Sequence, residues 1–259
     1  MNKNNLIVIA AIAAIAAGLV AWNAYRAFYG GRPKVLTAAT ATAPILPSQT
    51  ITVGGPTEIP QYRGAAIDAL STDEILKLLT PEQKERYLGE LAELAARLRT
   101  NPADLELWLH AGSLKNFFND YRGAADIWEH VTRLAPDDAT AYLNLGTLFA
   151  WNLADYPAAE RNFKKAIALS PSYAQGYLKL AEFYRLFVPE KKNEALTVLL
   201  RGLEKAPRDL GLLLALANDY KSAGDDANAL RYYEEYAAID PNNKDANAII
   251  AELRERLSQ

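Results

Sequence analysis

Residues 139–172 read ATAYLNLGTLFAWNLADYPAAERNFKKAIALSPS, and this stretch decides the fold. Large and small residues recur in it at helical spacing, and Pro171 closes it. Proline cannot continue a helix, and it is common in the turn that follows a helix end. The stretch therefore predicts two antiparallel helices that form one unit ending at the proline.

Prolines recur at the same spacing through the second part of the 259-residue chain. Pro102, Pro136, Pro171, Pro207 and Pro241 are separated by 34, 35, 36 and 34 residues. A period near 34 residues is typical of stacked helix–turn–helix repeats, because one unit alone cannot bury its apolar face. We predict an all-α solenoid whose repeats are residues 105–138, 139–173, 174–209 and 210–243.

Each predicted helix carries a small and a large residue four positions apart. In the first helices these pairs are Trp108 and Gly112, Tyr142 and Gly146, Tyr177 and Ala181, and Leu213 and Ala217. In the second helices they are Ala124 and Trp128, Ala159 and Phe163, Ala195 and Leu199, and Ala229 and Tyr233. Small residues let two helices approach to about 8–10 Å. We therefore expect Gly112 to seat against Ala124, and Gly146 against Ala159.

Polar residues after the turns are expected to cap the helices that follow. Side chains of Asp, Asn and Ser at this position accept hydrogen bonds from the first backbone N–H groups of a helix. The expected N-caps are Asp138, Ser172, Asp209, Asp225 and Asn243.

The pattern of an aromatic residue, Leu-Gly, Ala, a second aromatic residue, Ala and Pro resembles the tetratricopeptide repeat (TPR). The resemblance covers residues 105–257 and is best in the second and fourth windows. It implies a right-handed superhelical solenoid whose first helices line a concave groove that binds protein segments. The chain departs from the family by one extra residue in the second window and two in the third, near residues 187–191, which we expect to lengthen the turns.

Two further segments are expected to close the ends of the array. Residues 244–259 carry apolar residues at helical spacing and predict a C-terminal capping helix. Residues 66–104 predict an N-terminal helical cap or a degenerate repeat, with a long helix capped by Thr80 and a short helix near residues 72–79.

The front of the chain predicts a membrane anchor. Residues 6–25 carry no charge, and twenty helical residues span about 30 Å, the thickness of a bilayer core. After a short tail (1–5) we expect a transmembrane helix over residues 6–28, the alternative being a removed signal segment. Residues 29–65 read as a Thr/Ala/Pro-rich linker, extended and mobile. We expect a single-pass membrane protein whose repeat domain is extracytoplasmic rather than cytoplasmic.

The composition argues against catalysis and against nucleic-acid binding. The net charge is −3, there is no cysteine, and no basic block is present. The two histidines, His110 and His130, each follow a carboxylate by four residues, a spacing of ordinary helix side-chain pairing, and we expect them to be exposed or half-buried. No phosphate loop or activated nucleophile is recognisable. We therefore expect no enzymatic activity, no catalytic residue, no cofactor and no metal.

The TPR resemblance also implies which residues face the groove. One leucine per first helix occupies the same slot, at Leu109, Leu143, Leu178 and Leu214, and the alternative is that these leucines pack against the neighbouring helix. The predicted peptide-binding residues are Leu109, Ser113, Asn116, Phe117, Leu143, Thr147, Trp151, Leu178, Lys179, Glu182, Arg185, Asn218 and Lys221. Aromatic side chains such as Phe117 and Trp151 would be the anchors.

The function predicted from these features is that of a membrane-anchored TPR scaffold or adaptor. It would bind a protein or peptide segment in the concave groove, in the assembly of an envelope complex. The alternative is a structural subunit that associates with itself, or docks permanently in a larger complex, through its convex face or its ends. The sequence leaves the partner and the oligomeric state open.

Overall fold

The computed structural model describes residues 59–259. The predicted tail, the anchor over residues 6–28 and most of the linker lie outside the described residues. Residues 59–259 contain ten α-helices and no strand, so the all-α prediction is confirmed for this part of the chain. Among these helices, none combines the length and the apolar character needed to cross a bilayer.

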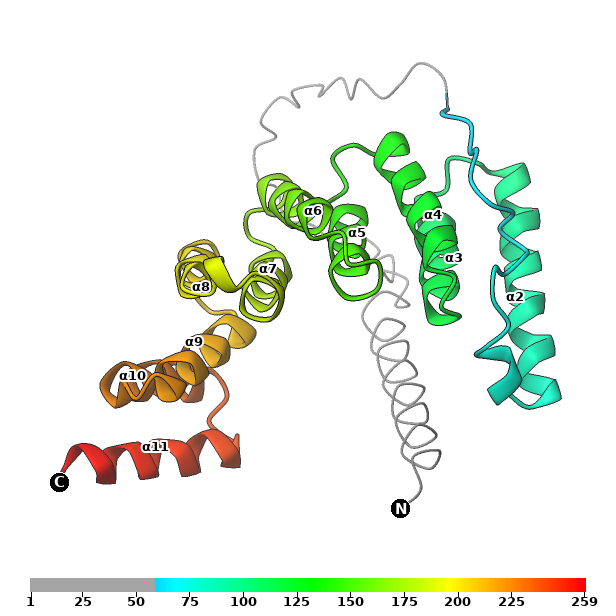
Figure 1. Ribbon diagram of the computed structural model, residues 1–259. Helices are drawn as coiled ribbons and strands as arrows, with labels where there is room; N and C mark the ends of the chain where they lie inside the picture. The colour runs from blue at the N-terminus through cyan, green and yellow to red at the C-terminus, as the bar shows by residue number, and fades with distance from the viewer. Residues whose placement is uncertain (1–58) are drawn as a thin grey trace, which may run out of the picture. The chain divides into compact units, whose positions relative to one another are not determined.

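The helices follow one another as a leading helix, a series of pairs and a closing helix (Figure 1). Helix α2 (Pro81–Thr100) leads, and α11 (Lys244–Leu257) closes the array. The pairs between them are α3 (Leu105–Phe117) with α4 (Tyr121–Leu134), α5 (Ala139–Trp151) with α6 (Tyr156–Leu169), α7 (Ala174–Phe187) with α8 (Glu194–Lys205), and α9 (Leu210–Ser222) with α10 (Asp226–Ile239).

The pairs stack as a solenoid. The two helices of each pair contact each other extensively, and the second helix of a pair also contacts the first helix of the next. Side chains from α5 belong to both of the buried clusters: Leu145 to the N-terminal cluster and Leu143 to the C-terminal cluster. Burial of this kind stabilises each repeat only when its neighbour is present.

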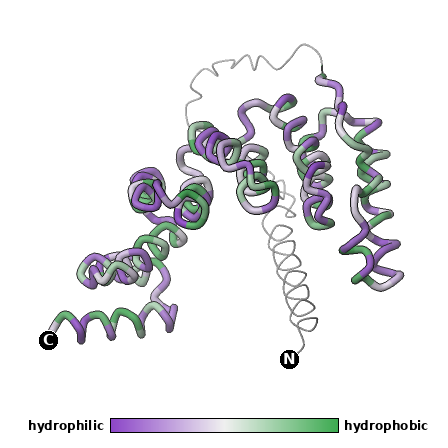
Figure 2. Tube along the Cα trace, viewed as in Figure 1, coloured by the Kyte–Doolittle hydropathy of each residue, from purple (hydrophilic) through white to green (hydrophobic). Residues whose placement is uncertain are grey.

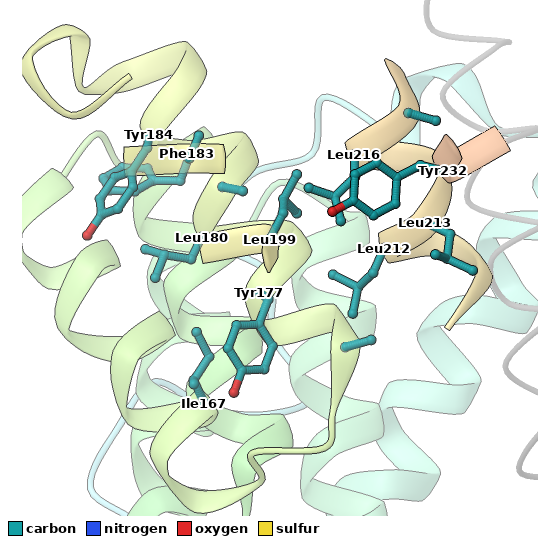
Figure 3. Close-up of a cluster of buried hydrophobic side chains, with 14 of the residues drawn as sticks. Ile167, Tyr177, Leu180, Phe183, Tyr184, Leu199, Leu212, Leu213, Leu216 and Tyr232 are labelled. Carbon is teal, nitrogen blue, oxygen red and sulfur yellow. The ribbon is translucent and has the colours of Figure 1, made fainter. Parts of the chain in front are cut away.

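The C-terminal cluster shows how three helices share one interior. Tyr177 of α7, Leu199 of α8 and Leu212 of α9 are all at most 2% exposed. Figure 3 shows these side chains converging, together with Leu180 and Leu216. A Cβ atom added at Gly202 of α8 would lie within 3.0 Å of both Tyr177 and Leu212, so this position admits no side chain without a shift.

Aromatic rings, rather than alanines, lie against Gly112 and Gly146. This corrects the expected pairing of glycine with alanine. A Cβ atom at Gly146 would lie 2.6 Å from Cδ1 of Phe163, and one at Gly112 would collide with the Trp128 indole. The large residue four positions after the alanine lies over the glycine, because a ring fills the space between two helices that alanine would leave empty.

Five of the six predicted N-caps are confirmed. The side chains of Asp138, Asp209, Asp225 and Asn243 accept backbone N–H groups of the helices they precede, and Thr80 forms a capping box with Gln83. The prediction for Ser172 is wrong. Helix α7 begins one residue later than that cap requires, so Tyr173 is the N-cap and supplies no side-chain hydrogen bond.

Two short segments also differ from simple expectation. The helix expected near residues 72–79 is only one 3-10 turn, Leu76–Leu78. The additional residues of the third repeat form another 3-10 turn, Pro189–Lys191, between α7 and α8. Residues 62–65, at the end of the predicted linker, lie against the first repeat: the Tyr62 ring lies 4.9 Å from the Trp108 ring, centroid to centroid.

Candidate functional site

The first helices of consecutive repeats line one side of the stack. Helix α5 contacts α7 directly, and α7 contacts α9. Second helices of consecutive repeats make no contact of this extent within residues 59–259. A stack curves toward the side on which its helices approach one another, so α5, α7 and α9 form the inner face, whereas α3 and α5 make no contact of this extent within residues 59–259. We call this face the groove.

The leucine at the repeated slot differs in exposure from one repeat to the next. Leu143 is buried at 9% exposure, whereas Leu214 is 36% exposed, and Leu109 and Leu178 are half-buried. Leu143 packs in the C-terminal cluster, which agrees with the alternative that these leucines pack against the neighbouring helix. The row is therefore apolar along its length, is most exposed in the fourth repeat and is buried in the second.

One turn further along each first helix, polar side chains bond to the protein itself. The hydroxyls of Ser113 and Thr147 each donate to a carbonyl oxygen of their own helix at 2.9 Å. Asn218 is exposed, and its Oδ1 accepts the hydroxyl of Tyr233 at 2.7 Å. The Oδ1 atom of Asn116 is buried and has no hydrogen-bond partner in the described structure.

Aromatic rings gather where the first helices end. Trp151 is half-buried, its ring lies 5.2 Å from that of Phe187 in edge-to-face geometry, and Lys179 Nζ lies 5.4 Å above it. Phe117 occupies the same end of α3 and packs 5.5 Å from Tyr87 of α2. Aromatic pairs and cation–π contacts of this kind hold the rings in place.

The positive charges of the groove are already paired. Arg185 Nη2 lies 2.6 Å from Asp219 Oδ2 across α7 and α9, and Lys179 lies 2.8 Å from Glu182. Lys221 lies 3.4 Å from Glu252 of α11. Burial raises the pKa of Asp219 although Arg185 opposes the shift. A groove whose cations already hold carboxylates is poorly suited to clamp the terminal carboxylate of a partner.

Three apolar residues beside this groove were not in the predicted set. Leu186 is 60% exposed and Tyr156 is 37% exposed, while the half-buried Phe187 stacks on Tyr156 at 5.4 Å. For Leu186 and Phe187, the signal in the sequence was the irregular turn that follows α7 directly. The rings of Trp151 and Tyr156 both contact Phe187, and we call these three residues the Trp151 patch (Trp151, Tyr156 and Phe187); Leu186 precedes Phe187 on α7.

The two histidines have different surroundings. His110 Nε2 lies 3.0 Å from Glu90 Oε1 of α2. His130 is 1% exposed, contrary to the expectation of an exposed or half-buried residue, because Tyr62 and Trp108 cover its ring. Burial, together with the nearby positive charge of Arg133, lowers the pKa of His130 to about 4. Within residues 59–259 no group of three potential metal ligands comes together.

Comparison with known proteins identifies the repeat. The tetratricopeptide repeat model matches residues 139–173, and no curated protein matches the chain. The chain is similar to the crystal structure of PilW, a widely conserved type IV pilus biogenesis factor, with 21% identity and a TM-score of 0.50 over 68% of this chain and 80% of that one. It is also similar to MamA, with 20% identity and a TM-score of 0.49 over 63% of this chain and 96% of that one. At such identity the similarity concerns the fold. The family match thus identifies one tetratricopeptide repeat at residues 139–173, and the stacked helix pairs share the fold of the PilW structure.

Proposed function

We propose that this chain is a scaffold that binds a segment of another protein along the groove, with the Trp151 patch as the main anchor. Residues 6–28 would hold it at a membrane, where it would take part in the assembly of an envelope complex. Residues 59–259 would then act as a binding surface, and the chain would not be an enzyme.

The observation that carries the proposal is the Trp151 patch at one end of the groove. Aromatic side chains provide a large share of the binding energy at protein interfaces, especially when they are already held in place. Trp151 is held by Phe187 and Lys179, so its ring loses little conformational freedom when a partner covers it. Leu186, which precedes Phe187 on α7 and is 60% exposed, offers further apolar area.

The groove also restricts the kind of segment that fits. Helix α5 carries no charged residue, and the cations of α7 and α9 are paired within the protein. An apolar or weakly charged segment would therefore lose less hydration on binding than a highly charged one. This favours an amphipathic helix or an extended apolar peptide as the partner segment.

A photo-crosslinking experiment in the producing cells tests the groove. A benzophenone amino acid at position 147 probes the groove, and the same amino acid at position 165, on the exposed side of α6, is the matched control. We expect a defined protein adduct from position 147 only, which weakens when Trp151→Ala is added. Equal adducts from both positions, or adducts that persist unchanged in W151A, would contradict binding in the groove.

The membrane proposal needs its own test. A reporter enzyme that is active on one side of the membrane only, fused after Gln259, scores the side on which the repeats lie. We expect activity outside the cytoplasm, and retention of the full-length chain in the membrane fraction after a high-salt wash. Release of a shortened chain into the soluble fraction would identify residues 6–28 as a removed signal segment.

A further inference from the structure

The first repeat is covered by a segment without α-helix, Tyr62–Ser71, which we call the strap. The Tyr62 ring lies 5.3 Å from His130, in addition to its contact with Trp108. The backbone N–H of Ala65 donates to Asp126 Oδ2 at 3.2 Å, and Asp68 lies 3.2 Å from Arg99. The strap therefore touches α2, α3 and α4 along its length.

Beneath the strap lies a lysine in a slot where the other repeats have aromatic rings. Counting from Trp108 and its equivalents, Lys115 corresponds to Phe149, Tyr184 and Tyr220. In the third repeat this slot faces the preceding repeat, because the Tyr184 hydroxyl donates to Glu160 of α6 at 2.7 Å. The first repeat is covered by the strap at this slot.

The lysine binds the strap and a buried carboxylate at the same time. Lys115 is fully buried, and its Nζ donates to Asp120 Oδ2 at 2.7 Å and to the carbonyl oxygen of Ala69 at 2.5 Å. Asp120, 1% exposed, caps α4 through Gly123 and accepts the Ser71 hydroxyl at 2.5 Å. The strap thus supplies one hydrogen-bond partner to each member of a buried ion pair.

This arrangement has the properties of a peptide-recognition site. A buried ion pair is stable only when further hydrogen bonds compensate for the lost hydration of both charges. The strap provides those bonds through a backbone carbonyl and a hydroxyl, and Tyr62 provides an aromatic anchor. An apolar covering helix would leave the remaining donors of Lys115 without a partner, so the pair favours this segment over a generic apolar cover.

We propose that the first repeat carries a binding site for an extended peptide, centred on Lys115 and Asp120, and that the strap is its ligand and opens as a unit. When it is docked, the strap fixes the point at which residues before 62 leave the first repeat. When it opens, the repeats α5–α10 stay folded. This proposal is independent of what binds in the groove.

A glycine-to-alanine pair tests the proposal in the full chain, solubilised in a mild detergent. A Cβ atom at Gly64 would lie 2.6 Å from Cβ of Asp126, whereas one at Gly89 of α2 meets nothing within 4 Å. Gly64→Ala should therefore displace the strap, and Gly89→Ala is its matched control. Trypsin cleavage after Arg63, followed by mass spectrometry, reports how often the strap opens.

We expect cleavage after Arg63 to be independent of urea well below the unfolding transition. Ser71→Ala should accelerate it about tenfold, the effect of losing roughly one hydrogen bond to Asp120. G64A should also accelerate it, through the steric contact with Asp126, while G89A stays near the parent rate. Hydrogen exchange in α5–α10 should not change. Cleavage that follows global unfolding, or equal rates for G64A and G89A, would overturn the proposal. So would a rate that falls as protein concentration rises, since the strap would then come from a second copy.

Discussion

The two ends of the array are closed in different ways. At the C-terminal end, α11 lays Ala246, Ile250 and Leu253 against α10, and Figure 2 shows the alternation of hydrophobic and hydrophilic residues along it. Its charges stay at the surface, where Arg254 pairs with Glu234. At the N-terminal end, α2 is supplemented by the strap, which covers a buried ion pair. An amphipathic helix can close an end through apolar contact alone, whereas a strap without a helical face is held by specific polar bonds.

The largest effect is expected at the buried pair. Lys115→Met leaves the Asp120 carboxylate buried without its cation, which should destabilise the N-terminal end by about 3–5 kcal/mol. Hydrogen exchange resolved by segment should show the loss in α3 and α4 before α9–α11. Adding Asp120→Asn, which keeps a capping side chain, should recover part of it. A K115M chain as protected as the parent would show that the pair does not stabilise this end.

The next effect is expected at the other end. Leu253 is fully buried, and Leu253→Ala should destabilise the docking of α11 by about 2–4 kcal/mol through lost apolar burial and the cavity that remains. Faster exchange in α11 and α10, with α2–α4 unchanged, would match this expectation. Alanine at the exposed Leu257 is the control, and an equal effect from it would refute closure by apolar contact.

A fall in pH should also affect the two ends differently, because His130 lies at the N-terminal end. Because the pKa of His130 is about 4 in the folded chain, against 6.5 for a free histidine, the unfolded state takes up the proton first. The stability contributed by neutral His130 is complete above pH 6.5 and is lost as pH falls toward 4, by on the order of 2–3 kcal/mol. His130→Phe should flatten this dependence between pH 6.5 and 5. His110→Gln is the control, and a parent-like slope in H130F would exclude His130 as its source.

The smallest effect is expected from the surface pairs of α11. Arg254→Met removes an exposed pair with Glu234 and should change stability by no more than about 0.5–1 kcal/mol. Urea unfolding followed by circular dichroism, at low and high salt, can detect a shift of this size. A loss comparable to that of K115M would mean that both ends depend on ion pairs, and the contrast between them would disappear.

The sequence predicted the fold more accurately than it predicted the residues of the groove. The sequence predicted the proline spacing, the close approach at Gly112 and Gly146, and most of the proposed N-caps, because each of these acts within one repeat. At the two glycines, however, the neighbouring side chains are aromatic rings and not alanines. The groove residues were assigned through the family resemblance, and they differ in exposure, since Leu143 is buried. Leu186, which was not assigned, is the most exposed large apolar residue within residues 59–259. Exposure at a repeated slot depends on the neighbouring repeat, which no single window contains.

The sequence by itself determined the repeat length, the all-α architecture of residues 59–259 and most of the predicted N-caps, because these follow from backbone preferences and apolar spacing over a few dozen residues. Only the tertiary structure decided that Lys115 meets the carbonyl of Ala69, 46 residues away, and that Asp120 meets Ser71, 49 residues away. Such contacts depend on which segments the folded chain brings together. Lys115 stands where the other repeats have an aromatic residue, and its role depends on the segment that covers it.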